Sequence, residues 1–335
     1  MQQRYLFASL VTTLLISIST VQAAVYNVGP GKDYATIQAA VDAVAATDTA
    51  TGGGDNTSAR DKEIRIFPGT YTENVSIPAD PAGSSWNTAN DGWTIRADQR
   101  GTVTVNGGFS MGAGRDSFVF DGIDIMVQNG SHGVAMFGGT NRFNMFKNMV
   151  IDGQYSTDSW ASGLNGHNGY GQNSADHVTI VNMPAKAIYG TYKVGWYISN
   201  SILANNEVGI GQEGDWIGSN HTNNFGNTTN CIGSCNDWDS ASGPYNNISQ
   251  DPGFVSTDPS DPGYLFLSDS SPSAGTGNSA GLATAPHAWE NRGPGTYMGI
   301  THNNMGARPL YSVVPEPASF VLLAAGTLLG LRRRR

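Results

Sequence analysis

The sequence predicts an all-β fold, a right-handed parallel β-helix with a short N-terminal capping helix, because one short phrase recurs along the chain. Residues 198–203 (ISNSIL) match residues 146–151 (FKNMVI) position by position, and residues 120–125 (FDGIDI) fit the same frame. Residues 180–182 (IVN) begin a further copy. Each phrase places short apolar runs around an Asn or Gly turn, which is typical of short strands joined by tight turns. Such a unit cannot bury its own apolar face, whereas stacked units share one core.

The repeat frame also predicts which side chains point into the solenoid. The expected inward positions are Ile123, Val150, Ile180, Ile202 and Val208. Asparagine tolerates a left-handed backbone, and its amide can hydrogen-bond to the equivalent residue of the next coil. We therefore expect a ladder of turn asparagines at Asn148, Asn182 and Asn200.

Composition agrees with an exported β-solenoid. The chain has 43 glycines, about 13 % of its residues where roughly 7 % is average. Charged residues make 13 % of the chain, about half of the usual share of roughly 25 %. The formal net charge is −9, which disfavours nucleic acid as a partner because bulk charge would repel it.

Two segments precede the coils. Residues 1–23 combine Arg4, an apolar run and small residues at the cleavage position, which is the pattern of a secretory signal peptide. An anchor helix is the alternative, but the run is shorter than the roughly 20 residues that span a bilayer. The next segment carries apolar residues at helical spacing, at Ile37, Ala40, Val41 and Val44. We expect a short helix there that covers the open end of the solenoid.

The C-terminus has three parts in a fixed order. Residues 314–319 (VPEPAS) contain a Pro-Glu-Pro motif, the following residues up to Leu331 are apolar, and four arginines end the chain. This order resembles the PEP-CTERM sorting signal of Gram-negative bacteria and is assigned to residues 313–335. The resemblance implies an exosortase-like processing enzyme as a partner, with the sorting motif at Pro315, Glu316 and Pro317.

The apolar segment 318–331 is predicted to be a marginal transmembrane helix, since its fourteen residues cover only about 21 Å of a core roughly 30 Å thick. The arginines would hold its end on the cytoplasmic side, so the inner membrane is a transient partner. A permanent single-pass anchor is the alternative. After cutting by signal peptidase and exosortase, the protein is expected to begin near Ala24 and to end before Phe320.

The start of the body, residues 24–312, resembles a known superfamily. Residues 34–43 (YATIQAAVDA) followed by residues 64–75 (IRIFPGTYTENV) are similar to the start of pectin methylesterases and of pectin-lyase-like β-helix proteins. The resemblance implies the fold of the body. The catalytic segments of the methylesterases have no counterpart further along the chain, so no catalytic residue is carried over and no methylesterase activity is expected.

The end of the body resembles the closing segment of bacterial secreted β-helix proteins. The similar phrases are DPGF at 251–254, DPGYLFL at 261–267, SPSA at 271–274 and NMGAR at 304–308. The resemblance implies a loop-rich C-terminal cap.

Several residues are candidates for chemistry. Trp160 and Tyr170 lie in a long polar loop and are candidate substrate contacts, because sugar rings stack on aromatic faces. A polysaccharide lyase needs a base and a group that neutralises a carboxylate. The candidates for these roles are Lys147, Asp152, Asp176, His177 and Lys186. Solvated turn residues are the alternative reading of the same five.

Two further patterns concern crosslinks and metals. Cys231 and Cys235 are the chain's two cysteines, and an oxidising compartment favours a disulfide between them. Asp237 and Asp239 alternate like the ligands of a calcium loop, but the distal Glu of such a loop is missing. No cofactor is therefore predicted, and calcium is the one ion that the sequence leaves open.

Together these patterns predict an exported protein of the cell surface or extracellular matrix of a Gram-negative bacterium. A glycan-binding or structural role, with extracellular polysaccharide as partner, is the first hypothesis. A lyase or glycoside hydrolase acting on uronate-containing glycans is the alternative.

Overall fold

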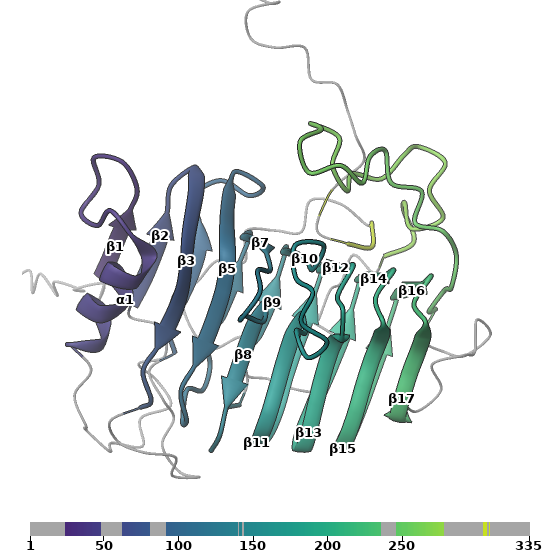
Figure 1. The fold of residues 1–335 in the computed structure, drawn as a ribbon, viewed down its shortest axis with the longest axis horizontal. Helices are drawn as coiled ribbons and strands as arrows, with labels where there is room; N and C mark the ends of the chain where they lie inside the picture. Colours follow the sequence, from purple (N-terminus) through teal and green to yellow (C-terminus); the bar gives the residue numbers. More distant parts are fainter. Residues whose placement is uncertain are drawn as a thin grey trace, which may run out of the picture.

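The protein is described by a computed structural model that covers residues 24–47, 62–80, 92–139, 141–142, 144–235, 246–277, 304–306 and 308. The predicted signal peptide and sorting signal lie outside these residues. The strands pair in parallel from one end of the molecule to the other (Figure 1). The prediction of a parallel β-helix is therefore confirmed.

Each full coil contributes to three parallel sheets. The first sheet contains β1 (Ala24–Val28), β2 (Lys62–Ile66), β4 (Thr94–Ala97), β6 (Val119–Asp121), β9 (Met145–Lys147) and the last residues of β11 (Leu164–Asp176), β13 (Lys186–Ser199) and β15 (Val208–Asn220). The second contains the first residues of β3 (Gly69–Ile77) and β5 (Val103–Met111), then β7 (Asp124–Met126), β10 (Val150–Asp152), β12 (Thr179–Val181), β14 (Ile202–Ala204) and β16 (Asn223–Phe225). The third contains the last residues of β3 and β5, then β8 (Val134–Phe137), the first residues of β11, β13 and β15, and β17 (Thr229–Cys235).

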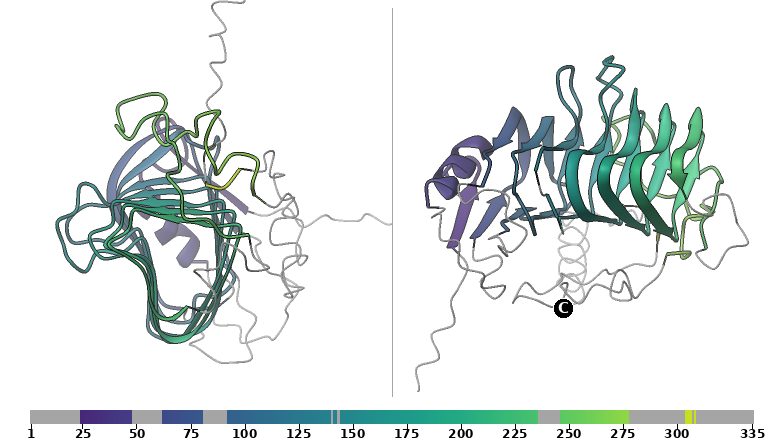
Figure 2. Two further views of the ribbon diagram at one scale, coloured as in Figure 1. Left: turned by 90° about the vertical axis from the view of Figure 1, so that its right-hand side faces the viewer. Right: turned by 90° about the horizontal axis from the view of Figure 1, so that it is seen from below.

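The helix α1 (Ile37–Ala45) lies across the N-terminal end of the solenoid (Figure 2). Its buried residues are Ile37, Ala40, Val41 and Val44, as predicted. The Glu73 carboxylate of β3 accepts hydrogen bonds from the backbone N–H groups of Ile37 and Gln38, both at 2.9 Å, and so caps the helix. Among the described residues no helix is long and apolar enough to cross a membrane. The predicted membrane segment 318–331 lies outside them.

An aromatic stack runs through the core along the solenoid axis. Phe109, Phe120, Phe146 and Trp196 follow one another with ring centroids 5.3, 5.3 and 5.9 Å apart. Each of the four side chains is at most 2 % exposed. Of these four rings, Phe120 and Phe146 occupy equivalent positions on neighbouring coils, whereas Phe109 comes from the third sheet and Trp196 lies two residues before the position in register with Phe146.

The predicted inward positions are only partly correct. Ile123 and Ile180 lie in the main core, and Val208 is 7 % exposed. Val150 and Ile202 belong instead to a second apolar cluster on the outer face of the second sheet. In the phrases VI and IL the second residue is the inward one, so Ile151 and Leu203 fill the main core. When two adjacent residues of a three-residue strand are both apolar, the sequence does not show which of them points into the solenoid, because the strap can bury the other one on the outer face.

The asparagine ladder is also corrected in its register. Asn148 and Asn200 share one turn column, with His177 between them, and all three have φ between 48° and 55°. Asn182 belongs to a different turn, after β12. The hydrogen-bond partners are aspartates of the preceding coil rather than asparagines.

These turn bonds follow one rule. The side-chain amides of Asn148, Asn200 and Asn182 donate to the carboxylates of Asp121, Asp176 and Asp152 at 2.7, 2.8 and 3.0 Å. Each bond joins a left-handed turn residue to the end of the strand one coil earlier. The turns thus lock neighbouring coils together.

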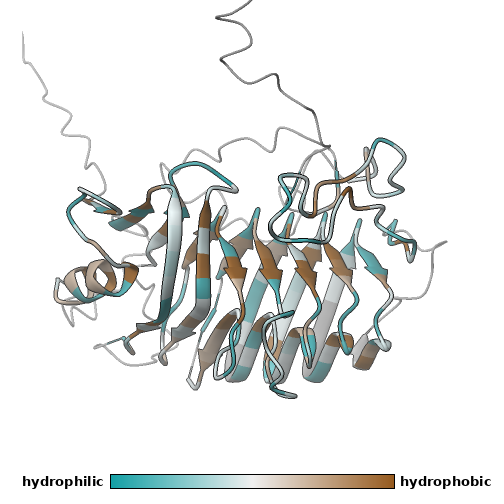
Figure 3. Cartoon of the chain, turned by 45° about the horizontal axis from the view of Figure 1, so that its top comes forward, coloured by the Kyte–Doolittle hydropathy of each residue, from teal (hydrophilic) through white to brown (hydrophobic). Residues whose placement is uncertain are grey.

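A C-terminal strap, defined as described residues 250–277, 304–306 and 308, lies along the outer face of the second sheet (Figure 1). Tyr264, Leu265, Leu267 and Met305 of the strap bury an apolar stripe of the sheet. The stripe consists of Met126, Val150, Val181, Ile202 and Ala204. Figure 3 shows brown, apolar segments on the strands that lie beside the strap. The described part of the predicted cap therefore covers a side of the solenoid.

Candidate functional site

An open groove of about 520 Å³ lies on the second sheet where the strap ends. This volume is within the roughly 300–1,000 Å³ that is usual for ligand sites. Its floor and walls are formed by Thr70, Thr72, Thr104, Asn106, Met126, Gln128, Tyr155 and Pro259. The groove therefore spans three adjacent strands, β3, β5 and β7, which cover about 10 Å along the solenoid axis at a spacing of about 4.8 Å.

Strand alternation explains why the floor is polar. Thr70 pairs with Thr104 and Thr72 pairs with Asn106 across β3 and β5. Tyr71 lies between the two threonines of β3 and belongs to the buried core. Because successive side chains of a strand point to opposite faces, the polar residues are turned outward as one array.

The groove is electrically neutral. None of the eight described residues that line it carries a charge. The side chains of Thr70, Thr72, Thr104 and Asn106 make no hydrogen bond to another described residue, so their donors and acceptors face solvent. Hydroxyl and amide groups each donate and accept hydrogen bonds. Such an array can bind a ligand rich in hydroxyl groups, but it offers neither a base nor a cation for catalysis.

One wall of the groove is a ridge, defined as the loops 128–132 and 153–163. The Asn129 carboxamide accepts a hydrogen bond from the Thr157 N–H at 2.7 Å, and the Gly130 N–H donates to the Asp158 carboxylate at 2.6 Å. These bonds tie the two loops into one wall. Tyr155 stands on the groove side of the ridge with 50 % of its surface exposed.

The other side of the ridge carries an aromatic cluster. Trp160 is 49 % exposed and meets the His132 ring edge-on, with centroids 4.8 Å apart. The ring of Phe137, which is 43 % exposed, also meets the His132 ring edge-on, with centroids 6.1 Å apart. Trp160, the predicted sugar contact, thus lies on the ridge but does not line the groove.

His132 is neutral at physiological pH. Burial lowers its pKa to about 4, and electrostatic repulsion between His132 and His167 acts in the same direction. The Ser162 N–H donates to Nδ1 at 3.1 Å, so the ring proton resides on Nε2. The uncharged imidazole ring therefore packs between the rings of Trp160 and Phe137.

This pKa predicts how the ridge responds to acid. In the unfolded chain His132 titrates near 6.5, so between pH 6.5 and 4 the folded state binds fewer protons. Its contribution to the free energy of unfolding is complete above pH 6.5 and is lost as the pH falls to 4, by on the order of 2 kcal/mol. His132→Gln should remove this dependence. Denaturant unfolding of the unaltered protein and of His132→Gln at pH 7 and pH 4 tests this. If the difference in unfolding free energy between the two proteins were the same at both pH values, the prediction would be contradicted.

On the opposite side of the groove the strap is fixed by buried polar bonds. The Arg308 Nη2 lies 2.6 Å from the Asp124 Oδ2, and the Tyr264 hydroxyl donates to Asp152. Burial raises the pKa of Asp124 to about 6, although the adjacent Arg308 guanidinium acts to lower it. Burial, with Asp152 nearby, also raises the pKa of Tyr264. These groups are bonded to one another and hold the strap.

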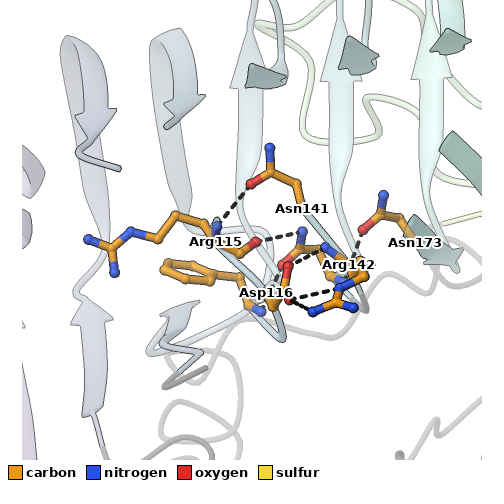
Figure 4. Close-up of polar contacts among 7 residues, drawn as sticks. Arg115, Asp116, Asn141, Arg142 and Asn173 are labelled. Atoms are coloured by element: carbon orange, nitrogen blue, oxygen red, sulfur yellow. Dashed lines mark hydrogen bonds and ion pairs between the residues drawn. The ribbon is translucent and has the colours of Figure 1, made fainter. Parts of the chain in front are cut away.

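A second polar network lies in the turns between the third and first sheets (Figure 4). Arg142 donates to the Asp116 carboxylate through its backbone N–H, Nε and Nη2, at 2.6, 3.0 and 2.8 Å. The Arg115 and Asn144 N–H groups are bound by the carboxamide oxygens of Asn141 and Asn173, both at 3.1 Å. Burial raises the pKa of Asp116 to about 6 despite the arginine. Except for the partly exposed Arg142 these residues are buried, so we assign the network to the fold.

The five predicted catalytic candidates do not meet in one place. They lie on all three sheets. Lys147 and Asp176 end strands of the first sheet and His177 follows directly, whereas Asp152 lies on the second sheet and Lys186 on the third. None of them lines the groove.

Asp176 and His177 are adjacent but buried. The Asp176 Oδ1 accepts from the Ser199 hydroxyl and the Asn200 amide, both at 2.8 Å, and lies 3.1 Å from the His177 Nδ1. Burial acts to raise the pKa of Asp176, but these hydrogen bonds outweigh it and bring the pKa below its ordinary value. His177 is 0 % exposed, so the pair cannot reach a substrate.

The other three have structural partners. Lys147 Nζ lies 3.4 Å from Asp121 Oδ2, Asp152 accepts from Gln154 at 2.6 Å, and Lys186 Nζ lies 3.8 Å from the centroid of the Tyr189 ring.

Other predicted residues fall wholly or partly outside the description. Asp237, Asp239, Pro315, Glu316 and Pro317 lie outside the described residues, as does the side chain of Tyr170. In the described part of the chain no group of His, Cys, Asp or Glu side chains is arranged to hold a metal ion. Cys231 is bonded in a disulfide. The Cys235 side chain is not described, so the Cys231–Cys235 pairing stays a prediction.

Sequence reasoning missed the groove itself. The alternating phrases TYT at 70–72 and TVN at 104–106 contained a signal, since they turn polar residues outward on two strands. Tyr155 and Pro259 gave none, because only the folded ridge and strap bring them to the same groove.

The fold and the groove define the class of this protein, a parallel β-helix with an exposed, uncharged groove on one face. A family model described as PEP-CTERM protein-sorting motif matches residues 313–335. The motif implies an exported protein that is anchored transiently at the membrane and processed by an exosortase. Neither the curated proteins nor the solved structures include a significant match to the chain.

Proposed function

We propose that this protein is a glycan-binding protein of the cell surface or extracellular matrix of a Gram-negative bacterium. Signal peptidase removes residues 1–23 and an exosortase releases the pectin-lyase-like body from its sorting tail. The body then binds extracellular polysaccharide through the groove on the second sheet. The observation that carries the proposal is the array of solvent-facing threonine and asparagine side chains beneath Tyr155.

Two features of the groove support a sugar ligand. Sugars present hydroxyl groups around an apolar ring face. Thr70, Thr72, Thr104 and Asn106 supply matching donors and acceptors, and Tyr155 supplies a half-exposed aromatic face at the wall. Trp160, on the far side of the ridge, is proposed as a flanking contact for a longer chain.

Affinity electrophoresis of the processed protein through gels that contain soluble polysaccharides tests the proposal. At least one polysaccharide should retard the protein, and Tyr155→Ala should weaken that binding by about 3- to 10-fold, the effect of losing one aromatic contact. Tyr192→Asn is the matched control. It removes an aromatic ring that is 54 % exposed elsewhere, and Asn tolerates the φ of 61° at this position. Equal losses in both variants, or no retardation by any polysaccharide, would refute the proposal.

A further inference from the structure

We infer that the groove selects neutral polysaccharide chains and discriminates against chains that contain uronates. This inference rests on the proposed function and names the ligand class of the same groove. It follows from two observations: no basic side chain among the described residues lines the groove, and acidic residues lie near it on the ridge and the strap.

The floor offers no partner for a carboxylate. A uronate carboxylate is bound well by arginine or lysine, which form charge-assisted hydrogen bonds with it. The eight residues that line the groove include no such side chain. The guanidinium of Arg308 in the strap already lies 2.6 Å from Asp124. A uronate in the groove would give up hydration without gaining an ion pair.

The rims of the groove carry acids. Asp158 follows Tyr155 on the ridge and binds the Gly130 N–H at 2.6 Å. Asp258 precedes Pro259 on the strap and accepts from the Ser260 N–H and hydroxyl, at 2.9 and 2.8 Å. Each acid is within three residues of a lining residue, Tyr155 on the ridge or Pro259 on the strap. The whole chain is also acidic, with a formal net charge of −9. Both the local and the overall field therefore repel an anionic chain.

The floor instead matches a ligand whose hydroxyl groups both donate and accept. Thr72 and Asn106 are paired neighbours on adjacent strands, so polar groups recur at the strand spacing of about 4.8 Å. The array ends at Met126 and Gln128, where the strap begins to cover the sheet. The groove itself therefore holds a short stretch of chain.

Isothermal titration calorimetry with size-matched oligosaccharides tests the inference. The probes are neutral gluco- and manno-oligosaccharides and, as the anionic arm, oligogalacturonate and oligomannuronate. The processed protein should bind its best neutral probe at least about tenfold more tightly than either uronate. That affinity should change less than about twofold between roughly 20 and 500 mM salt, since no ion pair is involved.

A charge placed in the groove should reverse the preference. Thr72→Lys adds an ammonium group to an exposed strand position, so the fold should be retained, and uronate binding should strengthen several-fold while neutral binding weakens. Thr228→Lys, at an exposed position on a distant coil, is the control and should change neither. Tighter, salt-sensitive binding of a uronate by the unaltered protein would overturn the inference and leave glycan binding intact. Binding of no probe would overturn both.

Discussion

Replacing Arg308 with methionine should lower the free energy of unfolding by about 3–5 kcal/mol at pH 7.5, the usual cost of leaving a buried charge without its partner. Asp124 is 4 % exposed, and Arg308 is its 2.6 Å ion-pair partner. Denaturant unfolding measures the loss. Arg308→Met combined with Asp124→Asn should recover most of it, because the double variant leaves no charge buried.

The same variant should be sensitive to pH. Burial raises the pKa of Asp124 to about 6 even with Arg308 present, and removing the guanidinium raises it further. Below pH 5 the carboxyl is therefore protonated in both proteins, and the difference in unfolding free energy should shrink. An equal loss at pH 7.5 and pH 4.5 would show that Arg308 acts through packing against Phe266 rather than through Asp124.

Replacing Ile202 with aspartate should also cost about 3–5 kcal/mol, because the new carboxylate would be buried between the second sheet and the strap without a partner. Thermal unfolding measures this loss. Val255→Asp is the control, since Val255 belongs to the strap but is 45 % exposed. A melting temperature of Ile202→Asp equal to that of the unaltered protein would mean that the strap does not cover Ile202.

The neighbouring residue distinguishes strap from core. Ile202 contacts the strap cluster, whereas Leu203 lies in the main core. In limited proteolysis Ile202→Asp should lose the strap first and leave the solenoid resistant. Leu203→Asp should make the whole body susceptible at once. The same digestion pattern for both variants would contradict the two-sided burial of β14.

Local sequence patterns predicted the coils because each coil is formed by short strands and turns that are close together in the sequence. The phrases FKNMVI and ISNSIL place a left-handed Asn between two short strands, and the helix spacing of Ile37, Ala40, Val41 and Val44 is fully realised in α1. Each element needs only its own residues and the coil beside it. The Pro-Glu-Pro motif with its apolar segment and arginines was recognised for the same reason, as a continuous signal.

Long-range contacts limited the rest. Ile202 and Val150 were predicted to point inward because the sequence does not reveal that a strap far later in the chain, with Tyr264, Leu265 and Leu267, supplies a second apolar surface. The candidate catalytic residues were grouped by proximity along the chain, but one coil spreads consecutive strands over three faces, which separates Asp152 from Asp176 and Lys186. The groove joins β3, β5, the ridge and the strap, so no single stretch encodes it.

The most direct test of the account is a crystal structure of the processed protein soaked with its tightest-binding neutral oligosaccharide. The account predicts sugar density on the second sheet, with hydroxyl groups within hydrogen-bond distance of Thr72, Thr104 and Asn106 and a ring against Tyr155. Sugar bound only at Trp160 on the far side of the ridge, or on another face of the solenoid, would contradict it.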